Sequence, residues 1–200
     1  MAELRGTLTI ELSGFWHAGG GKGDAWRADA VVHRDQLELP KIAGRQVAGL
    51  IAHQMHFLAE QKHITGAVHD AVCGLPEERG KRSRFESTPG LLSVDSARLP
   101  KAWLDWFETA DDASRLSAAA QLYRNFGSTA MQDGVPKDAT LRRVEVAVPL
   151  TLVAEVRLEG GDAAHKEAVE LAVGLVQELG AHRSRGLGAA RLSLEWEKPA

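Results

Sequence analysis

The sequence predicts an α+β fold with a βαββαβ core, the ferredoxin-like or RRM-like order of elements, carrying insertions and a protruding hairpin. Near both ends of the chain, and again in its second half, apolar residues alternate with polar ones, which is the period of a half-buried strand. Between these segments lie two stretches whose apolar residues recur at helical spacing. The order strand, helix, strand, insertion, strand, helix, strand gives the fold class.

The composition is that of one globular domain. The 200 residues are 44% hydrophobic and 26% charged, which suffices for a core and is too mixed for a disordered chain. We expect a single domain over 1–200. Its expected parts are a core of 1–62, 90–126 and 146–198, an insertion at 63–89, and a hairpin at 127–145.

Several classes of protein are excluded by simple features. A single cysteine, Cys73, rules out an internal disulfide framework and a multi-cysteine zinc site, so we expect no zinc. The longest run without Lys, Arg, Asp or Glu, Gln46–Ala59, is too short and too polar to span a membrane, and no signal segment opens the chain. We therefore expect a cytoplasmic protein with no membrane partner. The net charge of −3 excludes a uniformly basic coat, although not local basic loops.

The first strand and the first helix have the clearest periods in the N-terminal half. Alternation over Leu4–Leu12 predicts a strand, and the glycine-rich run HAGGGKGDAW that follows predicts irregular structure. Ala28–Asp35 is expected to be extended. Pro40 and Gly44 then precede a helix. Its apolar stripe consists of Val47, Leu50, Ile51, Met55 and Leu58.

The middle of the chain is less regular. Residues 66–90 lack a period and are expected to form a long insertion, after which Leu91–Leu99 is expected to be the second strand. Trp103–Phe107 and Leu116–Phe126 are expected to be helical, with Trp103, Trp106 and Phe107 as core or interface aromatics. The polar residues 127–143 suit a protruding hairpin.

The C-terminal part returns to clear patterns. Alternation from Val146 to Leu158 predicts one long strand, and Gly160–Gly161 turns the chain into a helix. Gly180 is expected at the C-cap of that helix. Its shared face consists of Ala168, Ala172, Leu175, Val176 and Leu179. A last strand carries Leu192, Leu194 and Trp196.

Two windows are basic and contain no acidic residue. They are Arg79–Phe85 (RGKRSRF) and Gly180–Arg191 (GAHRSRGLGAAR). Each can be a solvated surface loop, but the glycines of the second would let a polyanion approach the backbone closely. The aromatic pair Phe15–Trp16, at the end of the first strand, fits either base stacking or core packing.

Three segments, taken together, resemble the RAMP superfamily of RNA-binding proteins from CRISPR effector complexes. They are Leu8–Asp35, Leu39–Gly49 (LPKIAGRQVAG) and Gly180–Gly188 (GAHRSRGLG). Leu92–Ala97 (LSVDSA) is also similar to a strand of that family. The pieces span most of the chain in the family's order, so their co-occurrence is more specific than any one of them.

The likeness is greatest to the backbone subunits of type III complexes, the seventh Cas family. The resemblance implies a ribonucleoprotein for antiviral defence, with guide RNA, target RNA, further copies of the chain and other CRISPR effector subunits as partners. Met131–Glu145 is similar to the family's thumb hairpin. Its apolar residues Met131, Val135 and Leu141 would wedge between bases, pack on a neighbouring subunit, or do both.

The resemblance also implies where guide RNA binds. A single strand held without sequence preference needs cations, backbone N–H groups and room for close approach. Ala48 stands where the family has Lys, and Arg45 is the expected substitute. The basic side chains of residues 79–84 can track the RNA or be solvated. The predicted RNA contacts are Gly44, Arg45, Gln46, Gly49, His182, Arg183, Ser184, Arg185, Gly186 and Gly188.

Asp29 is the predicted catalytic residue, because it matches the aspartate that supports metal-dependent target cleavage in active members of the family. The reaction would be attack of a ribose 2′-hydroxyl on the adjacent phosphate, with a divalent cation, expected to be Mg²⁺, held partly by Asp29. One carboxylate is a poor metal site, and Asp24 is a possible second ligand. Alternatively, Asp29 caps a turn or pairs with Arg27 or Arg34.

Three other functions stay open. The chain can be a structural filament subunit without chemistry, or a single RNA-binding module that does not assemble into multimers. It can also be a guide-processing endoribonuclease of the same superfamily, with His17 and His33 as acid and base.

Overall fold

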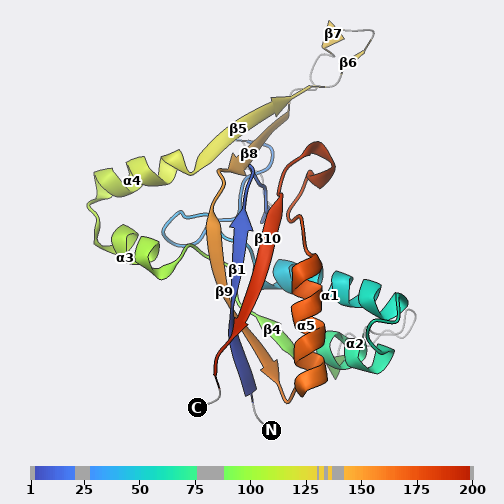
Figure 1. The fold of residues 1–200 in the computed structure, drawn as a ribbon. Coiled ribbons are helices and arrows are strands. Elements are labelled where there is room, and N and C mark those ends of the chain that lie inside the picture. The colour runs from blue at the N-terminus through green and yellow to red at the C-terminus, as the bar shows by residue number, and fades with distance from the viewer. Residues whose placement is uncertain are drawn as a thin grey trace.

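A four-stranded antiparallel sheet forms the centre of the protein (Figure 1). The computed structural model describes residues 3–20, 28–75, 88–129, 131–132, 135–136 and 142–198. The strands lie in the order β10-β1-β9-β4. The sheet and its two crossover helices are β1 (Glu3–Leu12), α1 (Gly44–Glu60), β4 (Leu92–Val94), β9 (Thr151–Glu159), α5 (Ala163–Leu175) and β10 (Ala190–Trp196).

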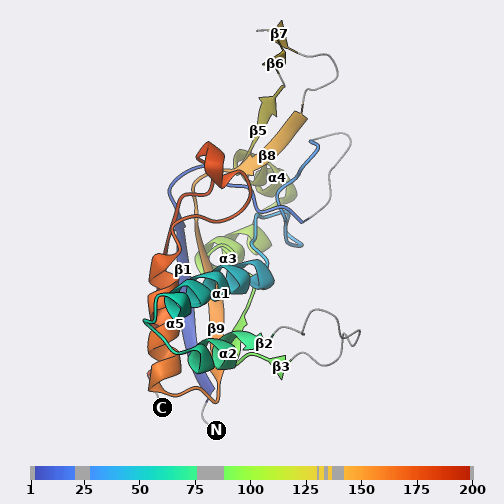
Figure 2. The same cartoon turned by 90° about the vertical axis from the view of Figure 1, so that its right-hand side faces the viewer.

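The chain order of these six elements is the predicted βαββαβ order. Neighbouring strands are antiparallel throughout, with Leu8 opposite both Leu194 on β10 and Ala154 on β9. The helices α1 and α5 both lie on one side of the sheet, as Figure 2 shows. The fold is thus α+β, with β9 and β10 on either side of β1 and β4 at the sheet edge beside β9.

The core lies between this helical layer and the inner side of the sheet. Leu8, Ile10 and Leu12 of β1 point inward and are almost completely buried. They meet the α1 stripe of Val47, Ile51, Met55 and Leu58, which is buried as its helical spacing predicts. Burying this apolar surface supplies the main stabilisation of the fold.

The other side of the sheet is polar, and we call it the open sheet face. It consists of the outward side chains of β1, β9 and β10, which hold five acidic and three basic residues and no aromatic one. Two of the basic residues already form ion pairs: Arg5 with Glu3 and Glu155, and Arg157 with Asp95 and Glu155. The members of the face are Glu3, Arg5, Thr7, Thr9, Glu11, Thr151, Val153, Glu155, Arg157, Glu159, Arg191, Ser193 and Glu195.

The remaining elements extend from this core at its two ends. A two-stranded ribbon, β5 with β8, rises from one end, and the helix pair α3–α4 leads into it (Figure 1). The bounds are α2 (Gly66–Cys73), β2 (Gly74–Leu75), β3 (Thr88–Pro89), α3 (Lys101–Thr109), α4 (Asp112–Gln121), β5 (Tyr123–Ser128), β6 (Met131–Gln132), β7 (Val135–Pro136), β8 (Arg142–Ala147) and the 3₁₀ turn η1 (Arg183–Arg185). No helix within the described ranges is long and apolar enough to cross a membrane.

The structure corrects several predicted boundaries. The expected irregular stretch 66–90 begins with the helix α2, whose N-cap Thr65 accepts a hydrogen bond from the backbone of Val68. The expected helix 116–126 starts earlier and ends at Gln121, because the next residues pair with β8 instead. In the first place a local cap supports a helix that has no clear apolar period, and in the second the pairing with β8 outweighs the apolar spacing.

The C-terminal predictions also need adjustment. The long alternating run is two strands, because Pro149 interrupts it and the chain passes from β8 to β9, which belong to different sheets. Helix α5 ends at Leu175, so Gly180 is not its C-cap. The second strand is short, and beyond it Ala97 and Arg98 form single bridges to Ile42 and Val153.

The aromatic residues divide between core and surface. Trp16 is completely buried and its Nε1 donates to the carbonyl of Val148 at 2.9 Å, so core packing is the correct interpretation for that residue. Phe107 is buried, whereas Trp103 and Trp106 are nearly half exposed.

Candidate functional site

A cavity of about 580 Å³ lies at the end of the sheet where β1 and α5 both give way to loops. Four segments line it: the loop after β1, the extended residues 29–31, the first turns of α1, and the loop after α5. Its lining includes His17, Gly19, Asp29, Gln46, Gly49, Gly180 and Arg183. The structure therefore brings together residues from both predicted RNA-binding segments and the predicted catalytic aspartate.

Asp29 is exposed and is fixed to the edge of β8. Its backbone N–H donates to the carbonyl of Arg143 at 2.9 Å, and its Oδ2 accepts the N–H of Arg143 at 2.7 Å. These two bonds hold the carboxylate at the cavity and leave Oδ1 without a described hydrogen-bond partner. The alternative partner Arg34 is engaged elsewhere, and Arg27 and Asp24 lie outside the described residues.

The N-terminus of α1 has no side-chain cap. The N-cap residue is Ala43, and the first turn holds no acidic residue, so the backbone N–H groups there keep the positive end of the helix dipole. Arg45 is exposed in this turn. Gln46 donates from Nε2 to the carbonyl of Gly19 at 3.3 Å, while its buried Oε1 has no partner among the described residues.

The predicted glycines fall into two groups. A Cβ on Gly44 would lie 2.0 Å from the carbonyl oxygen of Val94, and one on Gly188 would lie 1.9 Å from that of Leu179. Packing alone requires glycine at these two positions. A Cβ on Gly49 or Gly186 would meet nothing within 4 Å, so a ligand can approach the backbone there.

The loop after α5 presents its charged groups on the short turn η1. His182 before it and Gly186 after it both have a positive φ, of 60° and 78°. Arg183, Ser184 and Arg185 are exposed. Gly180, with φ of 84°, packs its backbone against the carbonyl of His17, which anchors the loop to the segment after β1.

A buried ion pair supports the segment that carries Asp29. Glu145, 4% exposed, accepts the N–H of Val32 at 3.0 Å and the guanidinium of Arg34 at 2.6 Å. Arg34 also bonds Glu38 and lies over the ring of Tyr123, 3.9 Å from its centroid. Burial lowers the pKa of Arg34, but Tyr123 and the two carboxylates together raise it by more, so the guanidinium stays charged.

The two histidines of the processing hypothesis have different surroundings. His17 is buried, and its Nδ1 lies 2.6 Å from the carbonyl oxygen of Glu145. It lines the cavity, whereas His33 is not among the lining residues. Partial burial and the nearby charges of Lys41 and Arg45 lower the pKa of His33. This cavity therefore does not bring the two rings together, and their role as acid and base stays a prediction.

The described residues do not by themselves fit a resident metal ion. Asp29 is the one carboxylate lining the described cavity, and Mg²⁺ prefers six oxygen ligands. Within the described ranges, no three His, Cys, Asp or Glu side chains gather as a metal site. A divalent ion here would need most of its ligands from RNA phosphates and water.

The predicted thumb is described only in part. Val135 on β7 is 61% exposed, and Met131 lies on β6, which pairs with β7. Leu141 and the basic residues 79–84 lie outside the described residues. The ribbon starts earlier than predicted, since β5 begins at Tyr123.

Sequence reasoning missed the supporting residues of the site. Glu145 and Arg34 are separated by more than a hundred residues, and no local sequence pattern indicates that they form an ion pair. The signal that existed was an acidic residue, Glu145, between the apolar residues Val144 and Val146 at the start of the alternating run. Arg143 was likewise counted as hairpin, although its backbone fixes the Asp29 carboxylate.

No family model matches the sequence, and no curated protein matches it. Solved structures do share its fold. A chain of the type III-B Cmr-beta cryo-EM structure in the apo state has 13% identity and a TM-score of 0.64, with 97% of each chain covered. A chain of the type III-B Cmr-beta structure bound to cognate target RNA has 12% identity and a TM-score of 0.65, with 95% of this chain and 96% of that chain covered.

Proposed function

We propose that this protein is a RAMP-type backbone subunit of a type III CRISPR effector complex, which binds guide RNA and cuts the paired target RNA beside Asp29. One observation carries the proposal. The cavity joins Asp29, the uncapped start of α1 and the basic loop after α5, three segments that lie far apart in the sequence. The full-length likeness to chains of Cmr-beta, one of them in a complex with target RNA, supports the same function.

Guide binding would use the positive groups around the cavity mouth. Arg45, Arg183 and Arg185 are exposed, and the ion pairs among described residues leave all three out. The start of α1 adds backbone N–H groups, and Gly49 and Gly186 leave room for a phosphate to come close. His182, Ser184 and Gln46 supply further polar groups.

Different parts of the chain would have different roles in the complex. The core sheet and its helices hold the cavity, and the ribbon β5–β8 carries the thumb, whose Met131, Val135 and Leu141 would separate bases or contact the next copy. Further copies and other effector subunits would cover the remaining surface.

Cleavage would use Oδ1 of Asp29, the carboxylate oxygen that has no hydrogen-bond partner among the described residues. In the proposed reaction a ribose 2′-hydroxyl attacks the adjacent phosphorus, and the Asp29 carboxylate would accept the hydroxyl proton. The P–O5′ bond breaks, which leaves a 2′,3′-cyclic phosphate and a 5′-hydroxyl that takes its proton from water. A divalent ion, expected to be Mg²⁺, would arrive with the RNA phosphates and neutralise their charge. The two hydrogen bonds to Arg143 restrict the carboxylate to one position, which is what such a group needs.

The decisive experiment compares target-RNA cleavage by the assembled complex containing wild-type chain, Asp29→Asn or Asp29→Ala, each with Mg²⁺ and with EDTA. The asparagine variant keeps an oxygen that can accept the Arg143 N–H and loses only the charge. We expect regularly spaced cuts with the wild type, and a loss of at least about 100-fold in rate with both variants, the lower end of what general acid–base catalysis contributes.

Guide and target binding by the two variants serve as the control and should match those of the wild type. If the wild-type complex binds target and never cuts it, Asp29 is structural and the chain is a scaffold subunit. If the chain binds guide RNA but stays monomeric on long guides, the single-module alternative is correct.

A further inference from the structure

Glu145, on β8, uses all four of its polar groups to hold the segments that follow β1 and line the cavity. Its backbone N–H donates to the carbonyl of Ala30 at 2.9 Å. Its backbone carbonyl lies 2.6 Å from Nδ1 of His17, which must donate because a carbonyl can only accept. Its carboxylate accepts the N–H of Val32 at 3.0 Å and the guanidinium of Arg34 at 2.6 Å. Because Glu145 is buried, water does not compete for these bonds.

The position of Asp29 depends on the strand edge that these bonds secure. Both described hydrogen bonds of Asp29 go to the backbone of Arg143, and the next residue, Ala30, forms a parallel bridge to β8. Beyond Ala30, the contact with β8 is made by the Glu145 side chain, which accepts the Val32 N–H. This bond therefore sets the direction in which the segment carrying Asp29 leaves β8.

We propose that Glu145 is a positioning residue for cleavage, which holds the Asp29 carboxylate in place through Ala30 and Val32. The proposal rests on the cleavage function proposed above. Asp29 is exposed and is held by β8 alone among the described residues, and a reacting group misplaced by about 1 Å can lose about 100-fold in rate. Glu145 itself is buried, so it acts through the backbone and not on the substrate.

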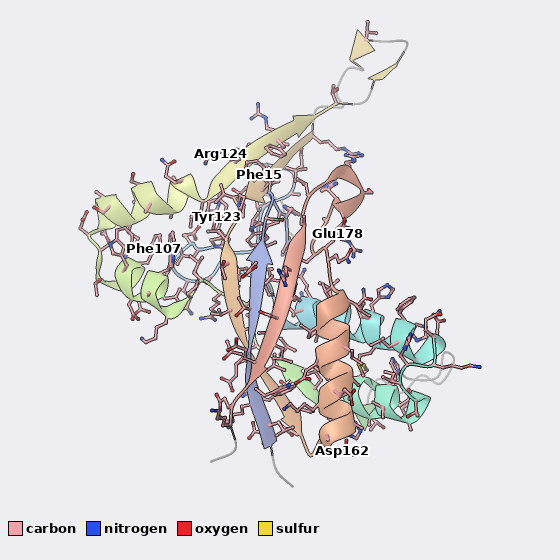
Figure 3. The ribbon with its side chains drawn as sticks, viewed as in Figure 1. Phe15, Phe107, Tyr123, Arg124, Asp162 and Glu178 are labelled. Atoms are coloured by element: carbon pink, nitrogen blue, oxygen red, sulfur yellow. The ribbon has the colours of Figure 1, made fainter. Side chains whose placement is uncertain are left out.

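Arg34 keeps the Glu145 carboxylate in one orientation. Its guanidinium lies 3.9 Å from the ring centroid of Tyr123, at the foot of the ribbon β5–β8 in Figure 3, and it also bonds Glu38. The Arg34 side chain is thus held by three partners. It can bind Oε2 of Glu145 while Oε1 stays directed at the Val32 N–H.

The test measures cleavage by the assembled complex at saturating target RNA with Mg²⁺, for the wild type and Glu145→Gln. An amide has a single oxygen, so glutamine can accept from Val32 or from Arg34 but not from both. We expect the saturating rate to fall at least about tenfold, while complex assembly and target affinity stay at wild-type values. Glu155→Gln, the same change on the open sheet face, should leave the rate unchanged.

Two further variants separate positioning from lost charge and lost stability. Arg34→Met removes the competing donors and keeps a long side chain over Tyr123. In Arg34→Met/Glu145→Gln the amide oxygen is free to accept the Val32 N–H, so this double variant should cut faster than Glu145→Gln alone. Leu58→Ala removes core contacts of α1 away from the cavity and should leave the saturating rate unchanged. Thermal unfolding verifies that each variant is folded at the assay temperature.

Each outcome is decisive. If Glu145→Gln cuts at the wild-type rate, or loses target binding as much as rate, Glu145 is not a positioning residue and the proposed cleavage at Asp29 stands. If the double variant is no faster than Glu145→Gln, the effect does not pass through Val32 and the proposal is wrong. It is also wrong if Leu58→Ala slows cleavage equally, since lost stability then explains the result. If the wild type never cuts target RNA, the proposed cleavage fails and the positioning role fails with it.

Discussion

The open sheet face and the loop end around the cavity differ in almost every property that matters for binding a polyanion. The open face has five acidic and three basic residues and no aromatic residue, and two of its three arginines, Arg5 and Arg157, are held in ion pairs. At the loop end, Arg45, Arg183 and Arg185 form no ion pair with another described residue, the start of α1 has no side-chain cap, and Gly49 and Gly186 face open space. Proteins of the RNA-recognition type bind RNA with aromatic residues on the sheet. This protein would bind it at the end of the sheet instead.

The largest expected difference concerns ion pairs. Glu145→Ala leaves the Arg34 charge partly buried and the Val32 N–H without its acceptor, and should lower the free energy of unfolding by about 3 kcal/mol. Asp95→Ala removes an exposed pair with Arg157 near the open face and should cost less than about 1 kcal/mol. Urea unfolding of both variants measures the difference. Equal effects would show that the loop end is not the more tightly organised region.

The next largest expected effect is a difference in stability between substitutions at two glycines of α1. Gly44→Ala places a Cβ against the Val94 carbonyl and should lower the free energy of unfolding by about 2 kcal/mol. Gly49→Ala, in the same helix but in open space, should raise it by about 0.5–1 kcal/mol. If RNA comes close to Gly49, this more stable variant should nevertheless bind RNA more weakly. Unfolding and RNA binding measured on one preparation separate the two effects, and unchanged RNA affinity would place the RNA elsewhere.

A charge comparison sharpens the assignment of the RNA surface. Arg183→Ala should weaken single-stranded RNA binding severalfold and reduce the slope of log affinity against log salt by roughly 0.7, the value for one lost phosphate contact. Arg5→Ala, on the open sheet face, should change neither. Fluorescence anisotropy titrations at three or more salt concentrations measure both slopes. A larger effect from Arg5→Ala would reverse the comparison.

The smallest expected effect is on pH dependence. Burial, Lys41 and Arg45 lower the pKa of His33 in the folded state, so the unfolded state binds more protons as the pH falls through the ordinary value of 6.5. Stability should therefore decrease from pH 7.5 to 5.5, and His33→Gln should flatten that decrease slightly. Denaturant midpoints at the two pH values measure it, with the exposed His53→Gln as the matched control. A steeper decrease in His33→Gln would contradict the sign.

The sequence predicted correctly those elements whose own residues show a clear apolar period. The alternation of Leu8, Ile10 and Leu12 and the stripe through Val47 and Ile51 gave the right elements, because one side of each is buried. The helix predicted through Phe126 failed, since β8 supplied a hydrogen-bonding partner that apolar spacing cannot reveal. The glycine-rich loop after α5 was identified correctly as a loop. The sequence did not show why each of its positions is a glycine.

The sequence by itself determined the order of the core elements and the two segments in which charge and glycine concentrate, because these follow from local period and composition. Tertiary structure alone decided that Asp29 lies against Arg143, that Glu145 holds Arg34, and that the predicted RNA-binding segments 44–49 and 180–188 meet at one cavity. Contacts between residues more than a hundred positions apart depend on how the chain folds back on itself. No local pattern encodes that path, which is why the site had to be found in the fold.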